Sequence, residues 1–432
     1  MTYWTKIWRW TSSPSTLPLR MDKWLLSLPA GWKISFGVWI RYTVDSPGAP
    51  PSMALNGEGT QYKHPPIDET QGDIRLLKLH PGNPGDTIST SLVTSHLSNG
   101  PFFEAISYVW GNYSDRAQIL VDGQLYCISK SLHDALHDLR HPDSVRTFWA
   151  DQVCIDQSAE SMAERSDQVG KMGQIYKTAS NVVVYLGRGT EHTETDMQHL
   201  QSFIQPYARG EEAPWSHIPI PDLGRSINNI LTSPWFERMW TVQEAVLAKK
   251  TTLQCGNYQV QWTCDLRTLR ALVFRIKSAV ISPVYHLHGT AKVDWTPLLY
   301  ILESQMRQAA RREGVVLQRN LLDVAFDYRY RKCVQPRDRY FAVLGIIEDD
   351  RGGSMCFEPD YSISVEEVHR QFTAEIQRIS EIEDAPLEEF RAVDPSSLPK
   401  CLGVDPSPFP RLGEPWIGSF TPIFMSAIND TG

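Results

Sequence analysis

Two carboxylates in this 432-residue chain lie where apolar residues surround them. Asp151 follows directly after a short apolar strand pattern at residues 147–150, and ligands of open α/β sheets bind outside the carboxyl ends of the strands. Glu244 lies at the edge of an apolar helical face, so its side chain borders the predicted core. Partial burial raises the pKa of a carboxyl group and makes it useful in catalysis, although the same position also suits a structural ion pair.

Other reactive side chains have simpler explanations. Cys154 lacks an accompanying histidine signature, which favours a small core residue over a nucleophile. His133, His137 and His141 recur every four residues, but they lie off the apolar face of their helix, which favours a solvated surface over a metal site. The chain contains no P-loop, no HExxH and no GxSxG motif, so we predict neither a metal nor a cofactor.

Composition excludes several classes of protein. The net charge is −8, and no basic run is interleaved with aromatic residues, which argues against a nucleic-acid-binding surface. Seven scattered cysteines without a CxxC pair indicate reduced thiols in a cytoplasmic protein rather than a disulfide framework. No stretch of about 18 uncharged apolar residues is present, so we predict no integral membrane segment.

A strand–helix–strand pattern predicts how Asp151 is positioned. Residues 147–150 form the first strand, and a capping box of Ser161 and Glu164 opens the helix that follows. Residues 181–186 are almost all apolar, which is typical of a strand buried on both faces. The short links predict that the two strands are parallel neighbours joined by a crossover.

Further elements are expected on both sides of this unit. Strand patterns at residues 74–79 and 102–110 come first, and Asp122–Gly123 predicts a hairpin with a type I′ turn. A helix is expected from Ser131 onward, and Ser233–Pro234 supplies an N-cap and a first-turn proline for the helix that carries Glu244. Helical patterns then follow at residues 265–279, 297–312, 320–328, 338–347 and 365–379.

These patterns divide the chain into four parts. Residues 1–70 form an irregular leader that contains six of the fourteen tryptophans; it suits either a membrane- or partner-binding arm or a disordered leader, and we favour the latter. Residues 71–250 form an α/β domain, residues 251–393 a mainly helical region, and residues 394–432 a proline-rich irregular tail.

Three ordered blocks of the α/β domain resemble the fungal heterokaryon-incompatibility (HET) domain. They are Phe103–Gly111, Trp149–Gln157 and Pro234–Glu244, and residues 338–345 and 359–362 resemble segments that follow this domain. The departures from the family pattern are Phe103 for tyrosine, Ile106 for leucine, Ala150 for isoleucine and Asp156 for asparagine.

The resemblance implies a role in fungal nonself recognition and in programmed cell death after incompatible cells fuse. The family is in turn similar to the TIR domain, a flavodoxin-like fold of which some members hydrolyse NAD. We therefore expect a TIR/flavodoxin-like parallel sheet core with added β-hairpins, followed by a mainly helical C-terminal region. By this resemblance Glu244 is the catalytic residue and NAD the candidate substrate. The candidate substrate-binding residues are Ser107, Tyr108, Trp110, Asp151 and Trp240.

Two functions of different classes remain open. One is an enzyme that cleaves the nicotinamide–ribose bond of NAD, and the other is a non-catalytic module that signals by self-association or by binding an incompatibility partner protein. An NAD hydrolase needs a carboxylate in a cleft, whereas a binding module does not. The discriminating observation is whether Glu244, Asp151 and the strand end at residues 107–111 converge on one pocket.

Overall fold

The computed structural model describes most of the chain between residues 62 and 384. The described residues are 32–35, 38–41, 62–68, 72–281 (except 113, 209, 263 and 264), 293–315, 324, 327–328, 331–346 and 358–384. Two compact units divide the chain, residues 1–369 and 370–432, and the described part of the second is residues 370–384. The predicted tail at 394–432 lies outside the described residues, as does most of the predicted helix at 320–328. The predicted domain boundaries stay predictions.

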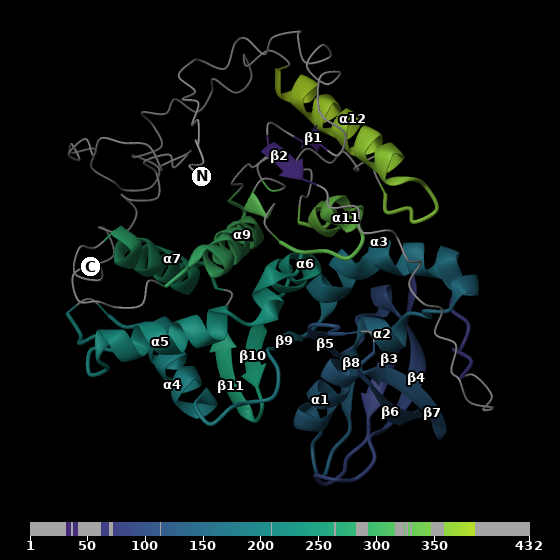
Figure 1. Cartoon of the computed structure of the whole chain (residues 1–432), viewed down its shortest axis with the longest axis horizontal. Helices are drawn as coiled ribbons and strands as arrows, with labels where there is room; N and C mark the ends of the chain where they lie inside the picture. The colour runs from purple at the N-terminus through teal and green to yellow at the C-terminus, as the bar shows by residue number, and fades with distance from the viewer. Residues whose placement is uncertain are drawn as a thin grey trace, which may run out of the picture. The chain divides into compact units, whose positions relative to one another are not determined.

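A nine-stranded mixed sheet forms the centre of the first unit (Figure 1). Its order is β11-β10-β9-β5-β8-β3-β4-β6-β7. The four strands β8, β5, β9 and β10 are parallel, and antiparallel pairs flank them on both sides. The strands are β3 (Asp73–Leu79), β4 (Ser89–His96), β5 (Glu104–Ser107), β6 (Arg116–Val121), β7 (Gln124–Ser129), β8 (Arg146–Trp149), β9 (Asn181–Tyr185), β10 (Thr251–Cys255) and β11 (Tyr258–Trp262). β1 (Trp32–Ser35) and β2 (Val38–Arg41) form a separate two-stranded antiparallel sheet.

Helices cover both faces of the parallel strands. On one face lies α1, whose Asp138 accepts a hydrogen bond from Tyr185 of β9. On the other face lie α3 and α6 (Figure 1). Tyr176 of α3 donates to the Ile106 carbonyl, and Glu244 of α6 accepts a hydrogen bond from Ser107. The helices are α1 (Lys130–Leu139), α2 (Asp151–Cys154), α3 (Met162–Thr178), α4 (Thr193–Ile204), α5 (Ile220–Leu231), α6 (Trp240–Val246), α7 (Leu266–Ile281), α9 (Thr296–Arg312), α11 (Asp338–Leu344) and α12 (Val365–Asp384), with 3-10 turns η3 (Leu97–Asn99), η4 (Ala159–Ser161) and η5 (Pro234–Glu237).

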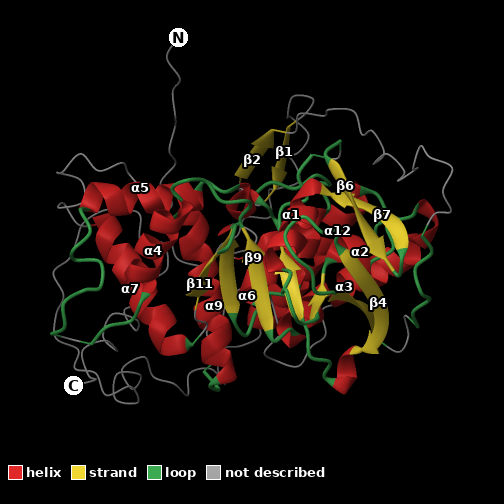
Figure 2. Ribbon diagram, turned by 90° about the horizontal axis from the view of Figure 1, so that it is seen from below, coloured by secondary structure: helices red, strands yellow, loops and turns green. Residues whose placement is uncertain are grey.

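The α/β class, the parallel strands of the core and the mainly helical C-terminal region are confirmed, although the sheet continues beyond residue 250 through β10 and β11. The hairpin turn is confirmed in detail, since Asp122 and Gly123 both have positive φ, 50° and 78°, as a type I′ turn requires. Helices α4 and α5 were not predicted from the sequence. They lie with α7 and α9 beside the β11 edge of the sheet (Figure 2). Among the described helices, none combines the length and apolar character that crossing a membrane requires.

The prediction that residues 147–150 and 181–186 form neighbouring strands is wrong. β5 lies between β8 and β9 and is parallel to both. Its pairing joins residues that are far apart in the chain, so no local pattern distinguishes an adjacent pair from a pair with one strand inserted. The crossover through α2 and α3 therefore passes over β5, which becomes a central strand of the parallel core.

One predicted helix start and one predicted capping box are also wrong, although α3 does begin after Ser161 as predicted. Ser129, not Ser131, caps α1 by accepting a hydrogen bond from the Leu132 backbone N–H at 3.2 Å. Glu164 does not close a capping box, because its carboxylate binds the buried guanidinium of Arg75 through two hydrogen bonds of 2.6 and 2.9 Å. A buried arginine needs a carboxylate partner more than a helix terminus needs a cap.

The helix expected from Ser233 onward is broken in two. Ser233 caps the 3-10 turn η5 as predicted, but Arg238 is extended, with φ −80° and ψ 143°, and only then does α6 begin. The break has a long-range cause, since Arg238 pairs with Lys332 in an isolated parallel bridge. The Met239 N–H donates to the Lys332 carbonyl at 2.8 Å, which replaces the helical hydrogen bond.

Candidate functional site

Glu244 is buried at the carboxyl end of the central strand β5. Its carboxylate accepts a short hydrogen bond from the Ser107 hydroxyl, and Ser107 is the last residue of β5. The same hydroxyl accepts a hydrogen bond of 2.7 Å from the indole N–H of Trp235 in η5. Only 3% of Glu244 is exposed, so Ser107 and Trp235 hold this carboxylate inside the protein.

Burial controls the protonation of Glu244. It raises the pKa of this carboxyl group to about 7, and the nearby Asp151 charge adds to the effect. The positive charge of Arg238 and the hydrogen bond from Ser107 act in the opposite direction. Glu244 therefore carries a mixture of protonated and ionised forms near neutral pH, as is common for groups that perform acid–base or electrostatic catalysis.

Asp151 is hydrogen-bonded to two further predicted site residues, Tyr108 and Trp110. Its carboxylate accepts hydrogen bonds from the Tyr108 hydroxyl and the Trp110 indole N–H, both at 2.8 Å, and from the Gln152 backbone N–H at 2.7 Å. Burial raises the pKa of Asp151, while the Arg238 charge and the bonds from Tyr108 and Trp110 lower it. The strand end after β5 is therefore fixed to the first residue of α2.

Arg238 acts electrostatically on both carboxylates, and it is not among the site residues predicted from the sequence. Its guanidinium donates a hydrogen bond to the Tyr108 carbonyl, and its charge acts on both Asp151 and Glu244. Trp235 was missed as well. Both residues belong to the third sequence block together with Glu244, and that membership was the signal that could have identified them.

Trp240 is the one predicted site residue that is not part of the hydrogen-bonded network around Asp151 and Glu244. Its side chain is hydrogen-bonded to Asp338 of α11, and Asp338 also accepts a hydrogen bond of 2.8 Å from the Tyr361 hydroxyl. Trp240 and Glu244 thus lie on the same helix but contact different partners. Ser107, Tyr108, Trp110, Asp151 and Glu244 form the network, and Trp240 connects α6 to the region that follows β11.

The helix α6 is held from several sides. With its amide oriented to satisfy both ends, Gln243 accepts from the Gly173 N–H at 2.7 Å and donates to the Ala342 carbonyl at 3.2 Å. Gln305 of α9 donates to the Ala245 carbonyl at 2.9 Å. These contacts from α3, α9 and α11 fix the rotation of α6 and hence the direction of the Glu244 side chain.

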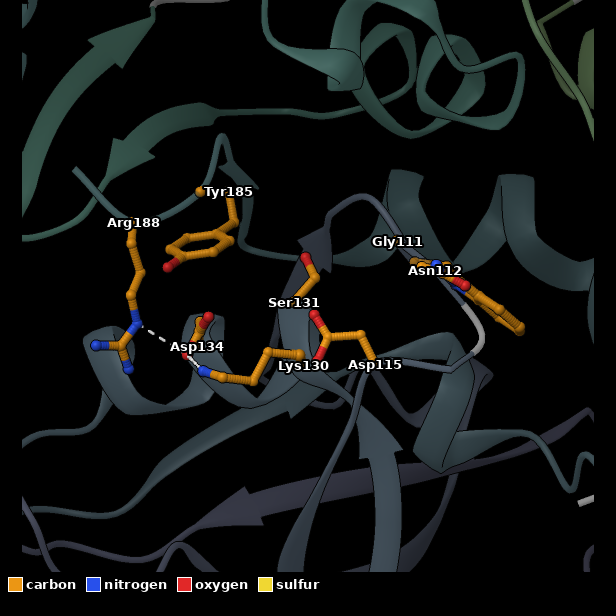
Figure 3. Close-up of a pocket in the computed structure, with 10 residues that line it drawn as sticks. Gly111, Asn112, Asp115, Lys130, Ser131, Asp134, Tyr185 and Arg188 are labelled. Atoms are coloured by element: carbon orange, nitrogen blue, oxygen red, sulfur yellow. Dashed lines mark hydrogen bonds and ion pairs between the residues drawn. The ribbon is translucent and has the colours of Figure 1, made fainter. Parts of the chain in front are cut away.

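An open cavity of about 220 Å³ lies at the carboxyl ends of β5 and β9 (Figure 3). Glu244 does not line it. Ser107 is paired with Val184 and faces α6, whereas the next residue of β9, Tyr185, faces α1 and the cavity. Of the five network residues, only Trp110 also lines the cavity, and its indole N–H donates to Asp151. Five of the six predicted site residues therefore form one buried network beside the cavity, and neither Glu244 nor Asp151 lines the cavity. The cavity is lined by Trp110, Gly111, Asn112, Asp115, Lys130, Ser131, Asp134, Tyr185, Gly187 and Arg188.

Residues 103–244 match the family described as Heterokaryon incompatibility protein (HET). The chain is a HET-domain protein. It is 30% identical over 354 residues to "Heterokaryon incompatibility protein 6, OR allele" of Neurospora crassa, a match that covers 69% of this chain and 50% of that protein. The chain thus spans about half the length of this curated relative. No solved structure matches the chain.

The HET domain contains every residue of the buried network, from Ser107 of β5 to Glu244 of α6. It also contains the three histidines considered as metal ligands. His133 and His137 each lie beside an aspartate of α1, Asp134 and Asp138. Within the described residues no group of histidine, cysteine, aspartate and glutamate side chains has the arrangement of a metal site.

Proposed function

We propose that this protein acts in fungal heterokaryon incompatibility, in the cytoplasm, where it detects nonself after cell fusion and triggers programmed cell death. The HET-domain match and the 30% identity to a protein named for heterokaryon incompatibility support this role. The partner that brings the signal is another protein or a second copy of this chain.

We further propose that the core is TIR/flavodoxin-like. The four parallel strands support this assignment, because numbering them along the chain gives the order second, first, third, fourth for β8, β5, β9 and β10. That is the order of flavodoxin-like sheets, in which the ligand binds where the chain leaves the first and third strands in opposite directions. Ser107 at the end of β5 marks this position.

The activity that we propose is hydrolysis of NAD at the nicotinamide–ribose bond. The bond from ribose C1′ to the nicotinamide nitrogen breaks, water adds its oxygen to C1′, and the proton of the water passes to solvent. Nicotinamide leaves as a neutral molecule, so acid assistance is of little use, and the barrier lies in the positive charge that develops on the ribose. A fixed carboxylate stabilises that charge.

The observation that carries this proposal is the contact between Glu244 and Ser107 at the end of β5. Glu244 is buried next to Ser107, at the position where the chain leaves the first and third parallel strands in opposite directions, which is the switch point of the sheet. In a buried position a negative charge interacts strongly with a developing cation. With a pKa of about 7 the carboxylate is ionised mainly above neutral pH, so nicotinamide release is expected to rise as pH increases through 7.

The test is nicotinamide release from NAD by the purified full chain. Glu244→Gln is expected to keep the fold and lose about a hundredfold or more in rate, the scale seen when one preorganised electrostatic group is removed. Glu237→Gln is the matched control, because Glu237 belongs to the same sequence block but is 52% exposed and pairs with Lys332. Equal rates in the wild type and Glu244→Gln would exclude Glu244 as the catalytic group.

A second candidate function is a non-catalytic signalling module, and one observation favours it. Glu244 is 3% exposed and does not line the open cavity, as expected for a structural carboxylate. If neither the wild type nor Glu244→Gln releases nicotinamide, while light scattering shows that the wild type self-associates, the module is the better description.

A further inference from the structure

The cavity beside the network lies at the switch point of the parallel sheet. After β5 the chain proceeds through β6, β7 and α1 to β8, on one side of β5. After β9 it proceeds through α4, α5 and α6 to β10, on the opposite side. The two connections diverge, which leaves a crevice between the carboxyl ends of β5 and β9, and the cavity is lined from both ends by Asn112 and Arg188.

Two cations in this cavity share one carboxylate. Arg188 Nε lies 2.8 Å from Asp134 Oδ1, and the Lys130 ammonium forms a short ion pair with the same oxygen (Figure 3). Partial burial alone would raise the pKa of Asp134, but the hydrogen bonds from Lys130 and Arg188 lower it. One carboxylate cannot use the full donor capacity of an arginine and a lysine. Within the described residues, the terminal nitrogens of Arg188 have no hydrogen-bond partner, and half of the side chain is exposed.

The remaining lining side chains suit the other parts of a nucleoside phosphate. Ser131 adds a hydroxyl group in the first turn of α1, where the helix carries partial positive charge. Asp115 is a carboxylate that can accept hydrogen bonds from ribose hydroxyls, as an acidic residue does in dinucleotide-binding folds. Trp110 offers an indole ring. The volume of about 220 Å³ is below the usual range for whole ligands of drug size, so it fits a phosphate and sugar rather than a whole dinucleotide.

We propose that this cavity binds the phosphate and ribose of a nucleotide, with Arg188 and Lys130 on the phosphate and Asp115 on the ribose. Asp134 holds the two cations in place when the cavity is empty and competes with the phosphate for them. The fork of the arginine matches two phosphate oxygens, which makes Arg188 the main contributor. This proposal does not rest on hydrolysis, because Glu244 lies outside the cavity.

The first measurement is calorimetric titration of the full chain with ADP, with inorganic phosphate and adenosine as partial ligands. ADP is expected to bind more tightly than either. Arg188→Ala is expected to weaken ADP binding at least tenfold, the loss typical of a charged hydrogen-bonding partner. Arg225→Ala is the matched control, because Arg225 pairs with Asp222 at 2.9 Å on α5 and is 66% exposed.

Asp134→Asn is expected to change ADP affinity in the opposite direction to Arg188→Ala. It removes the competing carboxylate, so ADP is expected to bind several-fold more tightly than to the wild type. Glu244→Gln is expected to bind ADP as the wild type does, which separates binding from any hydrolysis. The proposal is overturned if ADP does not bind at millimolar concentration, if Arg188→Ala binds it as well as the wild type, if Asp134→Asn does not bind it more tightly, or if adenosine binds as tightly as ADP.

Discussion

Replacing Glu244 with glutamine is expected to stabilise the folded protein at high pH. Glutamine keeps the shape of the glutamate side chain and still accepts the hydrogen bond from Ser107. It has no charge, so it avoids the cost of ionising a carboxyl group in a buried position. The variant therefore separates the proton equilibrium of Glu244 from its packing.

The magnitude follows from the shift of the pKa of Glu244 from 4.5 to about 7. The folded state holds this proton more tightly than the unfolded state does, so the group's contribution to stability is complete below pH 4.5 and is lost as pH rises through 7. At about 1.4 kcal/mol per pKa unit, the loss is about 1 kcal/mol at pH 5 and about 3 kcal/mol at pH 8. The glutamine variant does not suffer this loss.

The assay is urea unfolding of both proteins at pH 5 and pH 8, followed by tryptophan fluorescence. Between the two pH values the wild type is expected to lose about 2 kcal/mol more of its free energy of unfolding than Glu244→Gln. Titrating groups that do not interact with Glu244 contribute equally to both proteins and cancel in the comparison. If the two proteins change equally with pH, Glu244 does not ionise in a buried site and the electrostatic reasoning is refuted.

Two further predictions concern the packing that holds the site. Gly173→Ala is expected to cost about 1–3 kcal/mol, because an added Cβ would lie 2.9 Å from the Gln243 amide and 3.3 Å from the Gly345 backbone. Gly170→Ala, on the same helix with no atom nearer than 3.9 Å, is expected to stabilise the protein by about 0.5–1 kcal/mol, and thermal melting compares the two. Glu164→Ala is expected to cost about 3–5 kcal/mol, because it leaves the Arg75 guanidinium buried without its carboxylate partner. Urea unfolding measures this loss, and a cost below 1 kcal/mol would contradict the assigned role of the ion pair.

Local patterns predicted the elements well and their spatial order poorly. The turn at Asp122–Gly123 and the cap at Ser233 depend on neighbouring residues alone, and both are confirmed. The insertion of β5 between β8 and β9 depends on pairing across 77 positions, from Glu104 to Asn181, which periodicity does not encode. The break at Arg238 likewise arises from Lys332, which lies far along the chain.

The sequence predicted which residues belong to the candidate site better than it predicted how they are arranged. Ser107, Tyr108, Trp110, Asp151 and Glu244 were identified from strand ends, helix faces and family blocks, and they do contact one another. The sequence predicted that Glu244 borders the core, but its nearly complete burial could not be predicted, because residues of β5, η5 and α6 enclose it together. In the sequence, the donor Trp235 was recognised only as a member of the third family block.

The bridge between Arg238 and Lys332 has a consequence for how this protein is divided. The family match ends at Glu244, yet the helix that carries this residue begins at a backbone pairing with a segment nearly a hundred positions later. A fragment cut out by the family boundaries would keep every side chain of the network and lose the neighbour that sets where α6 starts. Recombination that exchanges the HET domain between relatives must therefore carry the later segment with it, or replace it with an equivalent. The structural unit that positions Glu244 is therefore longer than the family match at residues 103–244.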